Sequence, residues 1–480
     1  MKKLALALVP FFLASPALAE LATQQGADHL TQVFQTYFGP GADVISVAAN
    51  GEVYDLTVDV QPLIALGIEA GLTGSVSPVA MQLSDNGDGT WAVLMDQSIS
   101  IDLAMPAALD LKEEIASFSF TGTFDEALMA FTEAKGSFGG LTLAETIYTP
   151  DAPPQTIEMT LDSGTVESTA RAAAAGGGTD FDATFTGSGL TETMTTPGLN
   201  GEPAMPITIK AESLSQTVTG TQFMGAQMFQ LASWFIAHPD EAAMQADQAG
   251  LKALLSAAMP FFGNVQGTVT VDMLSVDTPM GAMGIESLGI VVDMNGAVSD
   301  GKFREGLSIS GLTLPAGLVP DWAAPLVPQA MSLDVQVTDF DAAAAITAAL
   351  SALDQPAGSA MGPEFDAALQ AALLPMGAVT ITLNPGSLTG EGYALTYEGT
   401  MVAGPDTEIP TGKATVTLTG ADALTAALNA APDDMKAQAM MGFGMAQGMA
   451  KAEGDKLIWE IDAATPGALS VNGMALMGGN

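Results

Sequence analysis

Apolar and polar residues alternate one by one along many stretches of this chain. In residues 54–60, tyrosine, leucine and valine alternate with aspartate and threonine, and the same period of two returns at 91–103 and 333–338. Successive side chains of a β-strand point to opposite faces, so this period is typical of strands with one buried and one solvated side. From Ser117 to about Thr196 it predicts one short strand after another.

The second half of the chain contains one pattern three times, a strand followed by two helices and another strand. The three segments are residues 206–275, 331–385 and 413–462. Each second helix is predicted to begin at a proline that an acidic residue follows, at Pro239, Pro363 and Pro432. Proline is tolerated at the first helical position, and acids suit the positive end of the helix dipole. Because the segments differ in length, we interpret them as diverged copies of one supersecondary unit.

These patterns predict an α+β, β-rich fold: a long antiparallel sheet, flat or curved, with amphipathic helix pairs packed on one face. Phe223, Leu231 and Phe235, for example, recur at helical spacing in the first segment. We expect a mostly-β region at residues 20–200 and an α+β region with the three repeats at 201–480. A chain of 480 residues is longer than one ordinary core needs, so two or more units are expected.

Residues 1–19 have the pattern of a secretory signal peptide. Lys2 and Lys3 precede a short apolar stretch, and the small residues around Leu18 predict cleavage between Ala19 and Glu20. The chain has no cysteine, which excludes disulfides and a lipid-modified cysteine. No later segment predicts a transmembrane helix. We therefore expect an exported protein in the periplasm of a Gram-negative bacterium.

The charge of the chain limits its partners. The formal net charge is −41 at pH 7, while 48% of the residues are hydrophobic. A negative surface repels phosphate backbones, so we expect no nucleic-acid partner. The large apolar share predicts a folded chain, since acidic disordered segments are poor in apolar residues.

The stretch SDNGDGTW, residues 84–91, is either a calcium loop or a turn. From Asp85, the third and fifth positions are Gly87 and Gly89, which have no side-chain oxygen, whereas a helix–loop–helix calcium loop needs ligands there. Strand patterns lie on both sides, so we predict a hairpin. Weak calcium binding by the acidic loop stays open. Asn50-Gly51 and Asn295-Gly296 also predict hairpins.

No other motif predicts chemistry, so we expect no catalytic residue, cofactor or metal site. His29 and His238 have no partner at zinc-ligand spacing. Gly442–Gly448 lacks the spacing of a dinucleotide loop. The methionines of residues 435–449 suit copper(I), irregular packing, or a pliant wall against an apolar ligand, and packing is the commonest role of methionine.

Three functions remain open from the sequence. The first is a non-enzymatic scaffold that binds a hydrophobic ligand, such as a lipid or an envelope component, in an apolar groove. The second is a carboxylate-dependent periplasmic hydrolase, and the third is a structural or interaction protein of the cell envelope. The oligomeric state is not predicted.

The signal sequence, the threonine- and glycine-rich strands and the stretch GLTLPAGLVPDWAAPLVPQAMSLDVQVTDFDAAAA, residues 311–345, carry a resemblance to a known family. The chain resembles domain of unknown function 2125, a family of exported alphaproteobacterial proteins. The ending LSVNGMAL, residues 469–476, is similar to the last strand of other large periplasmic families. The resemblance implies location and architecture, and it assigns no catalytic residue.

Overall fold

A computed structural model describes most of the chain after residue 20. The described ranges are residues 21–39, 43–66, 71–150, 152–196, 204–238, 240–352, 362–405, 410–465 and 467–477. The predicted signal peptide and its cleavage site at Ala19 and Glu20 lie outside these residues, as does Pro239.

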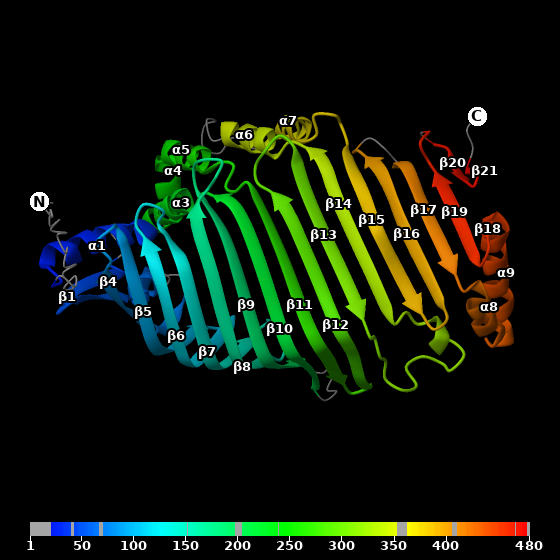
Figure 1. Ribbon diagram of the computed structural model, residues 1–480, viewed down its shortest axis with the longest axis horizontal. Helices are drawn as coiled ribbons and strands as arrows, with labels where there is room; N and C mark the ends of the chain where they lie inside the picture. The colour runs from blue at the N-terminus through cyan, green and yellow to red at the C-terminus, as the bar shows by residue number, and fades with distance from the viewer. Residues whose placement is uncertain are drawn as a thin grey trace, which may run out of the picture.

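The described part of the chain is rich in β-strands (Figure 1). The strands are β1 Ile45–Asn50, β2 Val53–Val58, β3 Thr73–Val76, β4 Val79–Asp85, β5 Thr90–Met105, β6 Leu109–Asp125, β7 Ala130–Ile147, β8 Gln155–Ala172, β9 Thr179–Thr196, β10 Met205–Phe223, β11 Asn264–Thr278, β12 Gly281–Asn295, β13 Gly301–Ser310, β14 Ala330–Phe340, β15 Val379–Gly390, β16 Tyr393–Ala403, β17 Thr411–Thr419, β18 Lys451–Glu453, β19 Lys456–Asp462, β20 Leu469–Val471 and β21 Met474–Met477. The helices are α1 Gln24–Phe38, α2 Gln61–Leu66, α3 Gly225–Ala237, α4 Glu241–Ala246, α5 Gln248–Ala258, α6 Ala342–Ala352, α7 Pro363–Leu373, α8 Ala421–Asn429 and α9 Asp433–Met449, with a 3-10 turn η3 at Ala324–Leu326.

All strands belong to one open antiparallel sheet, which confirms the predicted long antiparallel sheet. From β5 to β17 each strand pairs with the next strand along the chain. β1, β2 and β4 continue the sheet beyond β5, and β19 continues it beyond β17. The ladder between β9 and β10 carries the sheet without interruption from the predicted N-terminal region into the C-terminal one.

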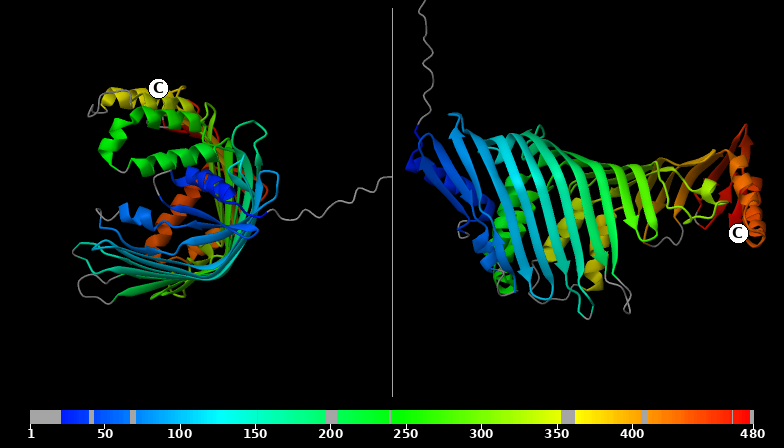
Figure 2. Two further views of the ribbon diagram at one scale, coloured as in Figure 1. Left: turned by 90° about the vertical axis from the view of Figure 1, so that its left-hand side faces the viewer. Right: turned by 90° about the horizontal axis from the view of Figure 1, so that it is seen from below.

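The sheet is curved, and an irregular line across it gives a physical reason for the bend. Along this line the ladders of β6 to β12 leave a residue of each strand unpaired: Ala116, Gly140, Asp162, Gly189, Glu212, Met273 and Glu286. Gly140, Gly189 and Met273 have positive φ values of 65°, 69° and 52°. Residues outside the ladder bend a strand and increase its twist. Viewed along its long axis, the sheet curves like a trough (Figure 2).

The same line explains why the prediction of short strands at 117–196 is wrong. The structure has long strands there, including β7, β8 and β9 with 18 residues each. The apolar residues lie on the same face of the sheet on both sides of the line. Because one residue of each strand lies outside the ladder at the line, the alternation of apolar and polar residues along the sequence shifts by one position there. In β8, Ile157, Met159 and Leu161 come before the slip and Val166 after it. Each long strand therefore has the sequence pattern of two short ones.

Apart from the short α2, the helices lie at three places on the sheet. α1 is at the N-terminal end, α8 and α9 are at the C-terminal end, and α3 to α7 follow one long edge, which we call the helical edge (Figure 1). Along the chain α3–α5 connect β10 to β11, α6 and α7 connect β14 to β15, and α8 and α9 connect β17 to β18. The second helix predicted for the segment 206–275 is divided into α4 and α5 at Asp247, whose carboxylate accepts a hydrogen bond from Gly250 N at the start of α5 (3.1 Å).

The described residues contain a compact core under α1, at the N-terminal end. Leu30 and Phe34 of α1 pack with Leu56, Leu83 and Phe124 of the sheet, and all five are nearly inaccessible. The rings of Phe34 and Phe124 are 5.0 Å apart. No helix among the described residues is long and apolar enough to cross a membrane.

Candidate functional site: an apolar trough

One face of the sheet is mostly apolar from β5 to β19. Directly opposed residues of antiparallel strands share a face, so the ladders trace it from strand to strand. The row Val265, Met294, Phe303, Val337, Ile381 and Met401 crosses six strands without a polar residue. This face contains Phe124, which contacts α1, and α1 lies inside the curve of the sheet (Figure 2). We call it the inner face, and the space that it lines the trough.

The inner face is left partly exposed in the C-terminal half of the sheet. In β11 to β16, strands whose residues are all described, no residue larger than glycine is buried. Phe303 and Leu333 of this face are each 38% exposed. A sheet face that packed on a second layer would bury such side chains. The structure therefore has an apolar surface that runs across neighbouring strands and that no other layer covers.

Helices cover the inner face near both ends of the trough. At the N-terminal end, α1 covers Trp91, Val93 and Phe124. At the C-terminal end the indole of Trp459 in β19 donates a hydrogen bond to Ala446 O of α9 (2.8 Å). The neighbouring Leu418 of β17 is only 2% exposed. The open part of the inner face thus lies between two covered ends.

The basic residues of the long strands lie on the opposite face, which we call the outer face. Their ion pairs there are Lys112–Asp102, Lys135–Glu167, Arg171–Asp182, Lys210–Asp277, Lys302–Asp293, Arg304–Asp334 and Lys413–Asp462. Pairs of serine and threonine hydroxyls also join neighbouring strands, such as Ser163 with Ser188 at 2.9 Å. The outer face is therefore a solvated surface whose cations already have partners.

One hydrogen-bonded polar group of the outer face surrounds Asp334. Its carboxylate accepts hydrogen bonds from Arg304 Nε (2.9 Å) and Asn384 Nδ2 (2.7 Å). The Arg304 guanidinium is the main cause that holds the pKa of Asp334 below its usual range, and the Asn384 amide adds to it. This group joins β13, β14 and β15, so we assign it a structural role.

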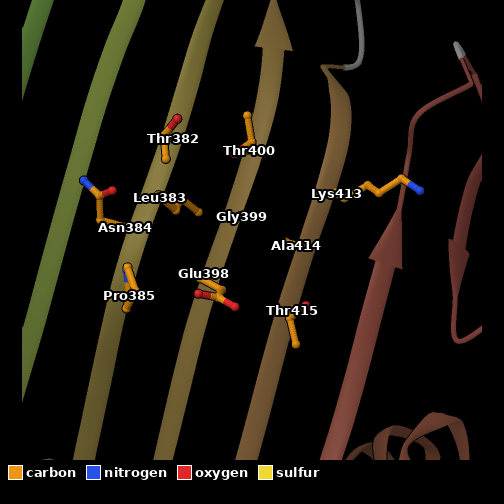
Figure 3. A pocket seen from close by; sticks show the side chains of 10 residues that line it. All are labelled: Thr382, Leu383, Asn384, Pro385, Glu398, Gly399, Thr400, Lys413, Ala414 and Thr415. Carbon is orange, nitrogen blue, oxygen red and sulfur yellow. The ribbon is translucent and has the colours of Figure 1, made fainter.

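A polar hollow lies beside this group on the outer face (Figure 3). It measures about 430 Å³ where the β15 ladder is irregular, between Leu383 and Gly386. Thr382, Thr400, Glu398 and Thr415 surround it, while Lys413 points away toward β19 (Figure 3). Its lining contains neither a histidine nor a pair of opposed carboxylates, so it offers no acid–base pair for a hydrolase.

The stretch SDNGDGTW forms the predicted hairpin, between β4 and β5. Its acids stabilise the turn: Asp85 Oδ1 accepts a hydrogen bond from Gly87 N (2.7 Å), and Asp88 Oδ1 accepts one from Thr90 N (3.1 Å). The hydrogen bonds from Thr90 lower the pKa of Asp88. Within the described residues, no group of three His, Asp or Glu side chains is arranged to hold a metal ion. Asn50-Gly51 and Asn295-Gly296 also connect antiparallel strands, as predicted.

The two histidines belong to different helices, His29 to α1 and His238 to the C-terminal end of α3. His29 Nε2 is 2.9 Å from Glu126 Oε2 beside Trp91, at the margin of the N-terminal core. His238 is the C-cap residue of α3, and its ring stacks on Trp234 with centroids 4.1 Å apart. Trp234 donates to Asp247 (2.9 Å), which is the main cause of the lowered pKa of that carboxyl. No serine or threonine hydroxyl is hydrogen-bonded to either ring in the described residues.

The methionine-rich segment forms α9, and Gly442–Gly448 lies within this helix instead of in a loop. Met441 and Met445 are 65% and 63% exposed. The methionines are therefore not packed in a core, and α9 carries apolar side chains on its surface beside the C-terminal end of the trough.

The comparisons with known proteins add no relative to this picture. No family model, curated protein or solved structure matches the chain. Sequence reasoning anticipated an apolar groove but not its position, although the basic residues at alternate strand positions carried a signal of which face is solvated.

Proposed function

We propose that this protein is a non-enzymatic carrier or scaffold that binds the acyl chains of a lipid in the trough. The observation that carries the proposal is the partly exposed apolar face of β11 to β16. Monomeric proteins rarely leave a continuous apolar surface of this kind open, and large exposed patches mark sites of interaction. An acyl chain is the occupant whose chemistry fits a long surface that is mostly apolar.

The side-chain types of the inner face favour aliphatic chains. In β11 and β12 this face is lined by branched or flexible aliphatic residues, and it has no ring: Val265, Val269, Val271, Leu274, Val276, Met283, Ile285, Leu288, Ile290, Val292 and Met294. Aromatic rings gather instead in β6 to β9, as with Phe138 and Phe185. Methionine adapts to a ligand without fixed shape, which supports an acyl chain over a flat aromatic ligand.

Three further predictions from the sequence are part of this proposal: the signal peptide, the internal repeats and the family resemblance. The signal peptide at residues 1–19, with cleavage between Ala19 and Glu20, supports a periplasmic carrier between the two membranes. The order of strands and helices supports three diverged repeats at 206–275, 331–385 and 413–462. The packing of their helix pairs on one face of the sheet stays a prediction. Membership of the domain of unknown function 2125 family stays a prediction, and it implies the same location outside the inner membrane.

The experiment that tests the proposal is detergent-free purification of the exported protein, followed by native mass spectrometry. We expect bound lipid in the parent protein and less in Ile290→Gln, because Ile290 lies on the inner face between Val269 and Leu307. The matched control is Val291→Gln, the next residue of β12, which faces outward opposite Gly306. Both variants are checked for folding by circular dichroism.

Two results contradict the proposal. One is a folded parent protein that never retains lipid, even after incubation with vesicles of mixed phospholipids. The other is equal lipid occupancy in Ile290→Gln and Val291→Gln, since the ligand is then not bound on the inner face. Either result favours a structural role in the cell envelope.

A further inference from the structure

The inner face carries four charged side chains among the residues that pair in the ladders from β5 to β17, and all four are glutamates. They are Glu113 in β6, Glu145 in β7, Glu192 in β9 and Glu305 in β13. The lysines and arginines of these strands are all on the outer face, where acids pair with them. The charged residues of the inner-face ladders are therefore all negative, whereas on the outer face basic and acidic residues pair with each other.

The four glutamates have apolar neighbours. Glu113 lies between Ile101 and Leu143, Glu192 between Met159 and Ile209, and Glu305 between Val292 and Val335. Glu145 lies between Leu111 and Ile157. No hydrogen bond or ion pair joins any of the four to another residue in the described ranges. Glu305 is exposed and the other three glutamates are partly exposed, so a cation that enters the trough can reach each carboxylate.

Three of these residues also share a position in the trough. Glu113 is four residues from the start of β6, Glu145 is two from the end of β7, and Glu192 is four from the end of β9. All three strand ends are at the edge opposite to the helical edge (Figure 1). Adjacent strands are about 4.8 Å apart, so the carboxylates follow this open edge while the apolar surface extends from them toward the helices.

We propose that the trough selects amphiphiles that carry a protonated amine in their headgroup. The acyl chain lies on the inner face, and the ammonium group binds the glutamates of the open edge or Glu305. Ammonium–carboxylate hydrogen bonds are charge-assisted and stronger than neutral ones. Anionic headgroups are repelled by the same carboxylates, with no inner-face cation in the ladders to offset the repulsion. This inference rests on the proposed function, because it names the ligand class of the same trough.

The test compares three amphiphiles with the same twelve-carbon chain, added to the full mature protein below their micelle concentrations. They are dodecylammonium, dodecyl maltoside and dodecanoate, and binding is measured by isothermal titration calorimetry at pH 7. We expect the order of affinity to be cationic, neutral, anionic, with the differences shrinking at high salt because screening weakens exposed charge pairs.

The variants separate the trough from the general negative charge of the protein. Glu192→Gln and Glu305→Gln are expected to lower the affinity for dodecylammonium about two- to fivefold each, as for partly exposed charge pairs. Their affinity for dodecyl maltoside should not change. The matched controls Glu158→Gln in β8 and Glu398→Gln in β16 remove the same charge from exposed positions of the outer face. They should leave the binding of all three amphiphiles unchanged.

The failures of the two proposals can be told apart. If dodecyl maltoside does not bind at all, the trough does not hold acyl chains and the proposed function fails. If it binds, but dodecylammonium and dodecanoate bind equally well, the lipid-binding function stands and headgroup selection is overturned. A preference for dodecylammonium that the outer-face variants reduce as much as Glu192→Gln also overturns it, since the net charge alone then explains the preference.

Discussion

The ring of Phe138 in β7 lies over Gly164, its cross-strand partner in β8. A Cβ atom added to Gly164 would be 2.3 Å from Cζ of Phe138. On the other side, Phe185 of β9 stacks on Phe138 with ring centroids 6.1 Å apart. Two rings from strands on either side of β8 thus meet above a position that has no side chain. Gly164 is therefore required by packing on the inner face and not by a turn.

Gly164→Ala is expected to destabilise the protein by about 1–3 kcal/mol, the usual cost of an added methyl group in a packed region. The measurement is urea-induced unfolding followed by circular dichroism. Gly442→Ala in α9 is the control, because no atom lies within 4 Å of its added Cβ. In a helix this change should stabilise by about 0.5–1 kcal/mol. Loss of stability in both variants, or in neither, would contradict the packing of Phe138 over Gly164.

Asp334→Asn should make the free energy of unfolding less dependent on pH in the acid range. The pKa of Asp334 is held below its usual range by Arg304, so its contribution is complete above the unfolded-state pKa, near 4, and is lost as the pH falls through the folded-state pKa. At pH 7 the variant should lose about 2 kcal/mol, typical of hydrogen bonds to a charged group. Urea unfolding between pH 7 and pH 2.5 should show this difference shrinking below about pH 4. A constant difference would exclude the ion pair as its cause.

Tyr37 should ionise much later than an ordinary tyrosine. Burial raises its pKa to about 12, and its hydroxyl donates a hydrogen bond to Met129 O (3.0 Å). The folded state holds this proton more tightly, so the contribution to stability is present below the unfolded-state pKa, about 10, and is lost as the pH rises toward 12. Ultraviolet titration of the phenolate band should show the late step, and Tyr37→Phe should remove it. A variant that keeps the late step would show that another tyrosine causes it.

The bend of the sheet can be tested at Gly189, where φ is 69° and an added Cβ would lie 2.1 Å from the Asp162 carboxylate. Gly87, with φ 79° and no atom near an added Cβ, is the matched control. Alanine costs about 1–2 kcal/mol at either site because of the positive φ. Gly189→Ala should cost at least about 1 kcal/mol more, since the Asp162 side chain must move as well. Equal losses in chemical denaturation would mean that the bend does not depend on this contact.

The sequence predicted the strands better than the shape that they build. Alternation identified the strand at 54–60 and the hairpin at 84–91, because both depend on neighbouring residues. The bend depends on one unpaired residue in each of several strands, such as Gly140 and Gly189, which align only after the strands pair. In the sequence this slip has the same appearance as a strand boundary, so long strands were predicted as short ones.

For the candidate site, the sequence predicted the apolar character of the surface but not the residues that form it. The apolar composition and alternation indicated an apolar groove, but which residues stay open depends on where the helices lie. Trp91 and Ile290 have the same alternating pattern around them, yet α1 covers the first while the second belongs to the open part of the trough. The unpaired glutamates, such as Glu192, stand out only when the ladders assign each residue to a face.

The contrast between the covered and the open parts of the inner face leads to a last prediction. Phe34 is 9% exposed and packs with Phe124 under α1, whereas Phe303 is 38% exposed on β13. Phe34→Ala should therefore cost about 3–5 kcal/mol, as for a buried ring. Phe303→Ala should cost less, about 1–2 kcal/mol, because more than a third of this side chain already remains exposed to solvent. Both losses are measured by urea unfolding of lipid-free protein. A large loss for Phe303→Ala would mean that this part of the sheet is packed against another layer in solution, and the trough would then be closed to a ligand.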